Sequence, residues 1–564
     1  MSKKQTCKNC AISFEITNDD LGFYEKLEVP PPTLCYDCRR QRRLAWRDDL
    51  SFYPRECGLC GKKIISIHAQ NNGLNVYCNS CFNSDNWDPY AYGVDVDFTR
   101  PIMDQIIELQ RSVPAPALIN DNGIASVGCE YTQDVAFSKN CYMLFVSWRD
   151  ENCLYTRYSA NVKDCVDCDS AFGNDQLLYD SIMVLDCYQC RNVYFSTGLS
   201  DCAYCYDCKG CTDCFMCIGL RQKKYCFKNK EYSKDEYRKI VDEYKLNTWS
   251  GSQKAHDEFT NFIALFPRRH ANFTNCVECT GNDLINSKNA KNCFNITRVE
   301  DSVNFENGDT VKNCYDCTIG GECQYCYECI TPDHGYMVRF CIESWKNSYI
   351  AYCENCHSSE YLFGCFSIRK GSYSIFNKKY TKDEYNELLP KVIEAMKREG
   401  TFGEFFPAER SYLGYNETLA NDYYPLTKEQ ALAKSYRWQD ELRKPMGQGT
   451  LAVKDLPDAI ADVQDSMLNE VLTCELCERN YKIVSQELDL YRKMNIPIPR
   501  HCFNCRIARR IAFRNPSNLW NRQCDCKKEG HNHSGQCENT FETSYSPDHP
   551  EKVYCEGCYN KEVL

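Results

Sequence analysis

Residues 187–226 read CYQCRNVYFSTGLSDCAYCYDCKGCTDCFMCIGLRQKKYC, and this stretch decides the fold class. Its cysteines all fall in one register of three, and Cys190, Cys202, Cys214 and Cys226 are spaced by twelve. A helix repeats its buried face every 3.6 residues and a strand every second residue, so neither explains a period of three. A short fixed repeat is typical of stacked units, and a twelve-residue coil with four inward positions gives this period. We therefore predict a thin β-solenoid with small inward side chains.

The same spacing recurs before and after this stretch. The two further columns are Cys129, Cys141, Cys153 and Cys165, and Cys317, Cys329, Cys341, Cys353 and Cys365. Segments 221–237 and 369–385 resemble each other, and each contains a capping box, which begins at Ser233 or Thr381. Because a solenoid needs polar ends to stop further stacking, we expect two solenoids with helical caps.

The two ends of the chain carry the same pair of cysteine clusters in the same order. The candidate ligands are Cys7, Cys10, Cys35 and Cys38; Cys57, Cys60, Cys78 and Cys81; Cys474, Cys477, Cys502 and Cys505; and Cys524, Cys537, Cys555 and Cys558. Four thiolates suit a tetrahedral zinc ion with Zn–S distances of about 2.3 Å, and they leave no open position for catalysis. We expect about four structural zinc ions, with iron–sulfur clusters as the main alternative. The first ligand of the fourth site stays open between Cys524, Cys526, His531 and His533.

The motif CxxC…CxxCRxxRR, at residues 7–43 and 474–510, resembles the small zinc-ribbon domain found in many bacterial proteins. That resemblance implies zinc binding at Cys7, Cys10, Cys35, Cys38, Cys474, Cys477, Cys502 and Cys505, and nothing more. The layout of most of the chain also resembles large cysteine-rich zinc-binding proteins of candidate-phylum bacteria. This second resemblance implies no activity.

Arginines follow the last ligand pair of each end motif, where treble-clef modules commonly place a helix. They are Arg39, Arg40, Arg42, Arg43 and Arg47, and Arg506, Arg509, Arg510 and Arg514. Arginines at this density can bind phosphate groups of a nucleic acid. The alternatives are a solvated face, or pairing with Asp48, Asp49 and the acidic solenoid.

Composition narrows the classes of protein that remain. The chain has 564 residues, a net charge of −11 and 43 cysteines, an odd number that fits poorly with complete disulfide pairing. The first residues, MSKKQTCKNC, contain no apolar secretory signal, and no run of 18 apolar residues predicts a membrane span. We therefore expect a cytoplasmic protein with reduced thiols. The solenoid cysteines then fill the core as small apolar side chains or form a redox or metal-storing array.

The predicted fold is mainly β, with two twelve-residue-per-coil β-solenoids flanked by tandem treble-clef or zinc-ribbon modules. The predicted domains are zinc modules at 1–50 and 51–100, a helical linker at 101–125, a solenoid at 126–228, a helical cap and connector at 229–275, a second solenoid at 276–376, a helical cap region at 377–445, a linker at 446–470, and zinc modules at 471–515 and 516–564. The chain contains no G-x-S-x-G, P-loop, H-E-x-x-H or G-x-G-x-x-G motif. We expect a non-enzymatic scaffold or adaptor whose zinc modules dock RNA, a ribosome or a protein. A redox or metal-storage protein is the alternative, and a structural or adhesive surface protein is the weaker one.

Overall fold

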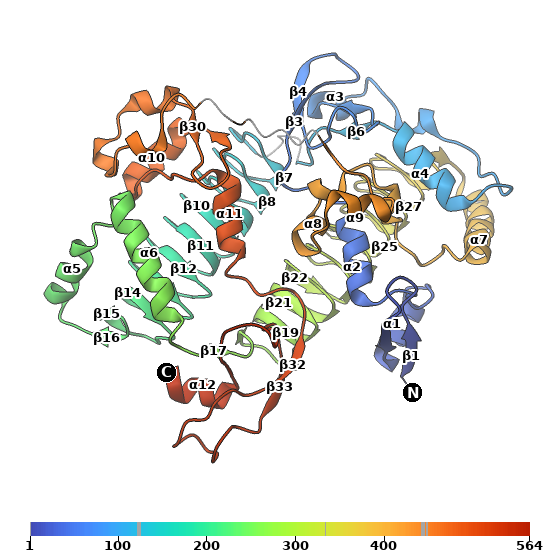
Figure 1. Ribbon diagram of the computed structural model, residues 1–564. Helices are drawn as coiled ribbons and strands as arrows, with labels where there is room; N and C mark the ends of the chain where they lie inside the picture. The colour runs from blue at the N-terminus through green and yellow to red at the C-terminus, as the bar shows by residue number, and fades with distance from the viewer. Residues whose placement is uncertain (1, 121–125, 333, 441–445, 447–448, 564) are drawn as a thin grey trace. The chain divides into compact units, whose positions relative to one another are not determined.

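The computed structural model describes residues 2–120, 126–332, 334–440, 446 and 449–563 (Figure 1). It divides into two compact units, and each unit is built from two separate parts of the chain. Unit 1 combines Met1–Asn122 with Phe273–Leu442, and unit 2 combines Gly123–Asn272 with Arg443–Leu564. The N-terminal cysteine clusters therefore belong with the second cysteine repeat, and the C-terminal clusters belong with the first. The last residues of the expected linker and cap region, 121–125 and 441–445, lie outside the described residues.

Unit 2 contains a ten-stranded sheet in which the strands follow one another in chain order. Its strands are β7 Gln133–Ala136, β8 Phe145–Trp148, β9 Arg157–Ala160, β10 Val166–Ala171, β11 Tyr179–Val184, β12 Arg191–Tyr194, β13 Ala203–Tyr206, β14 Thr212–Ile218, β15 Lys224–Phe227 and β16 Lys230–Glu231. All neighbours pair in parallel except β15 with β16, which form an antiparallel hairpin. Cys205 pairs with Cys217 and Cys214 with Cys226, which matches the twelve-residue spacing of the sequence.

Unit 1 contains a twelve-stranded sheet of the same kind. Its strands are β18 Phe273–Thr274, β19 Gly281–Ile285, β20 Lys288–Lys291, β21 Cys293–Val303, β22 Asp309–Lys312, β23 Cys314–Tyr315, β24 Cys326–Tyr327, β25 Tyr336–Arg339, β26 Ser348–Ala351, β27 Glu360–Phe363, β28 Ser372–Ile375 and β29 Lys378–Lys379. The last pair is again an antiparallel hairpin. Cys314 pairs with Cys326 in parallel, so the register again advances by twelve residues.

Left-handed backbone explains the period of three. Along both sheets, residues three apart repeatedly have positive φ, as at Asn140 (52°), Met143 (49°) and Val146 (54°). Many of the residues that directly follow such a position are buried. Left-handed backbone costs about 1–2 kcal/mol for most residues and less for Asn and Asp. Cys141 and Cys153, which directly follow such residues, are buried.

Helices cover parts of each sheet, so the chain is mixed α/β rather than mainly β as the sequence predicted. Unit 1 has α1 Asn18–Lys26, α2 Tyr36–Leu44, α3 Asn79–Phe82, α4 Ile102–Ser112, α7 Lys382–Glu399, α8 Leu419–Tyr423 and α9 Lys428–Ala433. Unit 2 has α5 Lys234–Glu243, α6 Trp249–Ile263, α10 Ser485–Met494, α11 Phe503–Ile511 and α12 Glu556–Val563. The expected capping boxes at Ser233 and Thr381 are present at the starts of α5 and α7. In the described part of the chain, no helix combines the length and apolar character that a membrane crossing needs.

Candidate metal centres and their arginine helices

The first cysteine cluster joins a hairpin to a helix. Cys7 and Cys10 lie in the turn between β1 (Lys3–Thr6) and β2 (Ser13–Ile16), while Cys35 precedes α2 and Cys38 lies in its first turn. The four sulfur atoms lie within 4.8 Å of one another. The Cys10 and Cys35 Sγ atoms are 3.6 Å apart, close to the ~3.8 Å edge of a tetrahedron with Zn–S distances of about 2.3 Å. This cluster could therefore hold a metal ion.

The second and third clusters repeat this construction. β3 (Tyr53–Glu56), β4 (Lys63–Ser66) and α3 surround the second cluster, and β30 (Leu472–Thr473), β31 (Asn480–Tyr481) and α11 surround the third. The Sγ atoms of Cys60 and Cys78 are 4.0 Å apart, and those of Cys477 and Cys502 are 3.5 Å apart. In the first three clusters the residue after the second cysteine, Ala11, Gly61 or Glu478, has left-handed backbone that closes the knuckle.

In the fourth cluster all four residues that the sequence offered as first ligand lie near the last three cysteines. Cys524 lies with Cys537, Cys555 and Cys558, all four sulfur atoms being within 4.8 Å of one another. The Cys524 sulfur also accepts a hydrogen bond from the backbone N–H of Cys555 at 3.2 Å. The residues that the sequence offered as replacements form a second group around Cys558, namely Cys526, His531 and His533.

The arginines after the first cluster point at the acidic side of their own sheet. Arg39 makes a bidentate contact with Asp316, with a closest N–O distance of 2.8 Å. Arg42 contacts Glu328 at 2.7 Å. The remaining contacts in this row are Arg40 with Glu306 at 2.6 Å, Arg43 with the Thr318 hydroxyl at 3.3 Å, and Arg47 with Glu343 at 2.9 Å.

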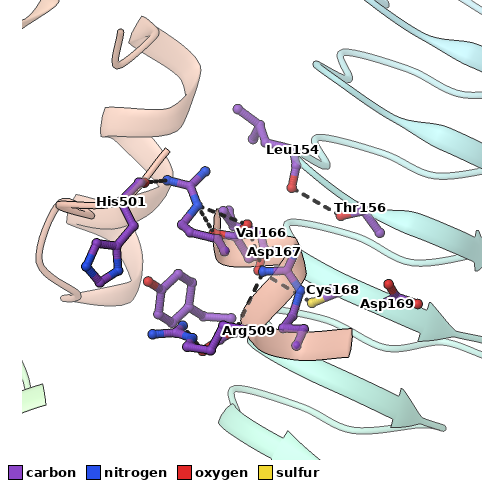
Figure 2. Close-up of polar contacts among 12 residues, drawn as sticks. Leu154, Thr156, Val166, Asp167, Cys168, Asp169, His501 and Arg509 are labelled. Carbon is purple, nitrogen blue, oxygen red and sulfur yellow. Dashed lines mark hydrogen bonds and ion pairs between the residues drawn. The ribbon is translucent and has the colours of Figure 1, made fainter. Parts of the chain in front are cut away.

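Helix α11 repeats this docking in unit 2. Figure 2 shows the helix that carries Arg509 beside the strand that carries Asp167 and Asp169. Arg506 and Arg510 each contact Asp167 at 3.0 Å, and Arg509 contacts Asp180. Arg514 contacts Asp169 at 2.6 Å.

The two helices use equivalent partners. Arg39 and Arg506 hold the same place in their end motifs, as do Arg42 and Arg509. Their carboxylate partners in each unit lie on neighbouring turns of the repeat, twelve residues apart from Asp316 to Glu328 and thirteen apart from Asp167 to Asp180. The duplication of the end motifs therefore extends to the surfaces on which they dock.

Most of the arginines that pair with carboxylates of the sheets are buried. Arg39, Arg40, Arg43, Arg506 and Arg510 are at most 4% exposed. Burial alone would lower the pKa of Arg506, but the surrounding groups, with Asp167 first among them, together outweigh burial and hold that pKa well above its usual value. Side chains in this state face the protein's own carboxylates, which favours the pairing alternative over a phosphate-binding surface.

Aromatic side chains beside the arginines anchor the same helices. Trp46 is buried, and its indole N–H donates to the Phe406 carbonyl at 3.2 Å. Phe513 stacks on Tyr194 of β12, with ring centroids 4.4 Å apart. Each ring packs inside its unit, which supports an anchoring role rather than base stacking.

The repeat cysteines line the interior of both sheets. Many of their thiols donate to a backbone carbonyl two residues earlier, as Cys153 does to Glu151 at 3.3 Å and Cys365 to Phe363 at 3.4 Å. Burial raises the pKa of the Cys293 thiol to about 12 and that of Cys353 well above its usual value. Cys293 and Cys353 are thus held in the protonated form, whereas a metal ligand is a thiolate. Hydrogen bonds from the Cys129 and Cys153 thiols have the opposite effect on Cys141 and lower its pKa to about 4.

Comparison with known proteins does not assign the chain to a family. No family model and no curated protein matches the chain. Five solved chains match, and one of them is described as a "putative acetyltransferase from Desulfovibrio desulfuricans G20", at 7% identity over 47% of this chain and 71% of that one. Its TM-score of 0.11 is too low to indicate a shared fold.

Sequence reasoning named the arginines and offered pairing with the acidic solenoid as one alternative, but it did not identify the individual partners on the sheets. The signal was present as acids one repeat apart, Asp316 and Glu328, at a fixed offset from the inward cysteines. It could not be used because nothing in the sequence showed which cluster pair docks on which repeat.

Proposed function

We propose that the protein is a non-enzymatic zinc-binding scaffold built from two β-solenoids, each locked by its own pair of zinc modules. The parallel register of twelve residues supports the solenoids, as do the left-handed corners and the buried inward rows. Closed sets of four thiolates support structural zinc.

One observation carries this proposal: the arginine helix that follows each end motif is buried against the sheet of its own unit. Zinc fixes the hairpin to the start of α2 through Cys7 and Cys35, and α2 then places Arg39 opposite Asp316. The metal and the ion pairs together hold the module on the sheet. In this account the end modules close each unit instead of presenting arginines to a partner.

The partner of such a scaffold is a protein rather than a nucleic acid. The net charge is −11, and the arginine clusters face internal carboxylates, so the phosphate backbone lacks its usual binding surface. Stacked tyrosines in unit 1 offer a contact surface of the kind that protein interfaces favour. Tyr349 and Tyr361 stack at 5.0 Å, and Tyr336 and Tyr349 are about 40% exposed.

Metal content separates this function from redox or metal storage. We expect elemental analysis of the full chain, purified under reducing conditions, to give four to five zinc ions. A content near one metal per four of the 43 cysteines, about eleven ions, would favour a metal-storage protein over the scaffold. Conversion of the buried thiols to disulfides by mild oxidants, with the fold retained, would support the redox alternative.

Partner class is tested by capture from the source cell and by a gel shift over a salt series. We expect protein capture that falls when Tyr336 and Tyr349 become Ser, with far-ultraviolet circular dichroism unchanged. RNA binding at low salt that is lost when Arg39, Arg40, Arg42 and Arg43 become Ser would contradict the assignment to a protein partner.

A further inference from the structure

The C-terminal module contains more metal-binding side chains than one zinc ion can use. Its ligand set corresponds to that of the second module, Cys57, Cys60, Cys78 and Cys81, with the same 17-residue separation of the pairs. The difference is a longer insert between Cys524 and Cys537. That insert carries Cys526, His531 and His533, and the second module has no counterpart to it.

The insert folds back over the module so that its three side chains meet Cys558. The ligand atoms of Cys526, His531, His533 and Cys558 lie within 4.8 Å of one another. Cys558 is at the same time a member of the four-cysteine set with Cys524, Cys537 and Cys555. One thiolate therefore stands between two groups of three further ligands.

We propose that this module binds two zinc ions bridged by the Cys558 thiolate. The first ion takes Cys524, Cys537, Cys555 and Cys558, and the second takes Cys526, His531, His533 and Cys558. Both ions are then four-coordinate with the N and S ligands that zinc prefers. This inference rests on the zinc binding proposed above for the terminal modules.

The two histidines are oriented as metal ligands. His531 directs Nδ1 at the Cys526 sulfur, 3.1 Å away, and its Nε2 lies 3.9 Å from a Glu562 carboxylate oxygen. His533 directs Nε2 at the Cys558 sulfur at 3.4 Å, and its Nδ1 lies 3.0 Å from the Gly535 carbonyl oxygen. A ligating histidine commonly uses its second nitrogen in this way, because a carboxylate or carbonyl fixes the ring.

Charge balance favours two ions over one. A single zinc ion on the four-cysteine set would carry a net charge of −2 and would leave Cys526 and His531 buried beside it. Two ions with five thiolates and two neutral imidazoles carry a net charge of −1. The second zinc ion thus binds Cys526 and His531, which would otherwise be buried without a metal ion.

The two ions differ in access to solvent. A cavity of about 440 Å³ borders both groups, because its lining includes His531 and His533 of the second and Cys537 and Cys555 of the first. The side chains themselves differ in exposure. His533 is partly exposed, whereas Cys524, Cys537 and Cys555 are buried. We therefore expect a chelator to remove the second ion before the first.

Cadmium-113 NMR of the full chain, reconstituted with ¹¹³Cd²⁺, tests the bridge directly. We expect four resonances in the region of four-thiolate sites and one upfield, from two thiolates and two nitrogens. The upfield signal should show scalar coupling to one of the four through the shared sulfur. The spectrum needs no variant, so a folding defect cannot obscure it. Absence of the upfield resonance, or an upfield resonance without coupling, would overturn the shared site.

Stoichiometry gives a second measurement. The double variant His531→Ala, His533→Ala should reduce zinc from five ions per chain to four, and His549→Ala, outside both groups, should leave five. Four ions in the unchanged protein and four in the double variant would defeat the inference while leaving the zinc scaffold standing. An absence of zinc from all modules would defeat both.

Discussion

Asp150 carries a carboxyl group that is buried in a row of small and apolar residues. It accepts hydrogen bonds from the Ser159 hydroxyl and the Val162 amide. Burial raises the pKa of Asp150 well above its usual value. The folded protein therefore keeps this acid protonated to a higher pH than the unfolded chain does.

Replacing Asp150 by asparagine should stabilise the protein as the pH rises. Above about pH 4 the wild-type free energy of unfolding falls by up to about 1.4 kcal/mol per pH unit until the raised folded pKa is reached. Asp150→Asn does not titrate, and its Oδ1 can accept from the Val162 amide while its Nδ2 donates to the Ser159 hydroxyl oxygen. Denaturant unfolding should show a gain of at least about 1 kcal/mol at pH 7.5 and a smaller gain at pH 5.5. The exposed Asp201→Asn is the control, and a gain independent of pH would contradict the explanation.

Replacing Arg39, which forms a buried ion pair with Asp316, should destabilise the protein, in contrast to the replacement of Asp150. Arg39→Met leaves a buried carboxylate without its partner, which should reduce the free energy of unfolding by about 3–5 kcal/mol. The double variant Arg39→Met, Asp316→Leu should recover much of this loss, because no buried charge remains. Chemical denaturation measures both.

An exposed pair is the matched control for this effect. Lys163 contacts Glu151 at 3.1 Å with both side chains about 40% exposed. Lys163→Met should change stability by less than about 1 kcal/mol. A comparable loss in both single variants would show that burial is not what distinguishes the arginine helix.

At the scale of the element, the left-handed corner is the feature that repeats. Lys346 is exposed and has φ of 58°, a conformation that asparagine adopts more readily than lysine. Lys346→Asn should raise the free energy of unfolding by about 0.5–1 kcal/mol, measured by thermal or denaturant unfolding. Lys288→Asn, at an exposed strand position without positive φ, should give no gain. A gain at Lys288 as large as at Lys346 would rule out the corner as the cause.

The period of three could be predicted from the sequence, but the left-handed backbone positions could not. The period of three was visible because each inward position accepts only small or apolar side chains, so Cys190 and Cys202 stand out in the sequence. The positions with left-handed backbone were not visible in the sequence, because they hold residues as different as Asn140, Val146 and Tyr155. At those positions the stacked ladder imposes the backbone angle, and the residue type has little influence.

At the scale of the whole molecule, each zinc pair belongs with the repeat that is distant in sequence. Cys7→Ser should open the first cluster, loosen α2 and speed amide exchange in strands β23 to β28, while the sequence-nearer strands β7 to β15 keep their protection. Cys474→Ser should give the reverse pattern. Hydrogen exchange read by mass spectrometry distinguishes these outcomes, and loss of protection in the nearer sheet would contradict the division into units.

The ligand sets were predictable from the sequence because CxxC spacing fixes them locally. The assembly of the units was not predictable, because it depends on contacts such as Arg42 with Glu328, 286 residues apart. Neither partner signals the other in the sequence. The role of Cys526, His531 and His533 was left open for a similar reason, since only the folded insert shows that they surround Cys558.

The division into units has a consequence for synthesis of the chain. The N-terminal module leaves the ribosome about 200–300 residues before its sheet, which at about 5–20 residues per second is a delay of roughly 10–60 s. During that interval its arginines are without Asp316, Glu328 and Glu343. We therefore expect the N-terminal module to reach its docked position only after the second repeat has been synthesised.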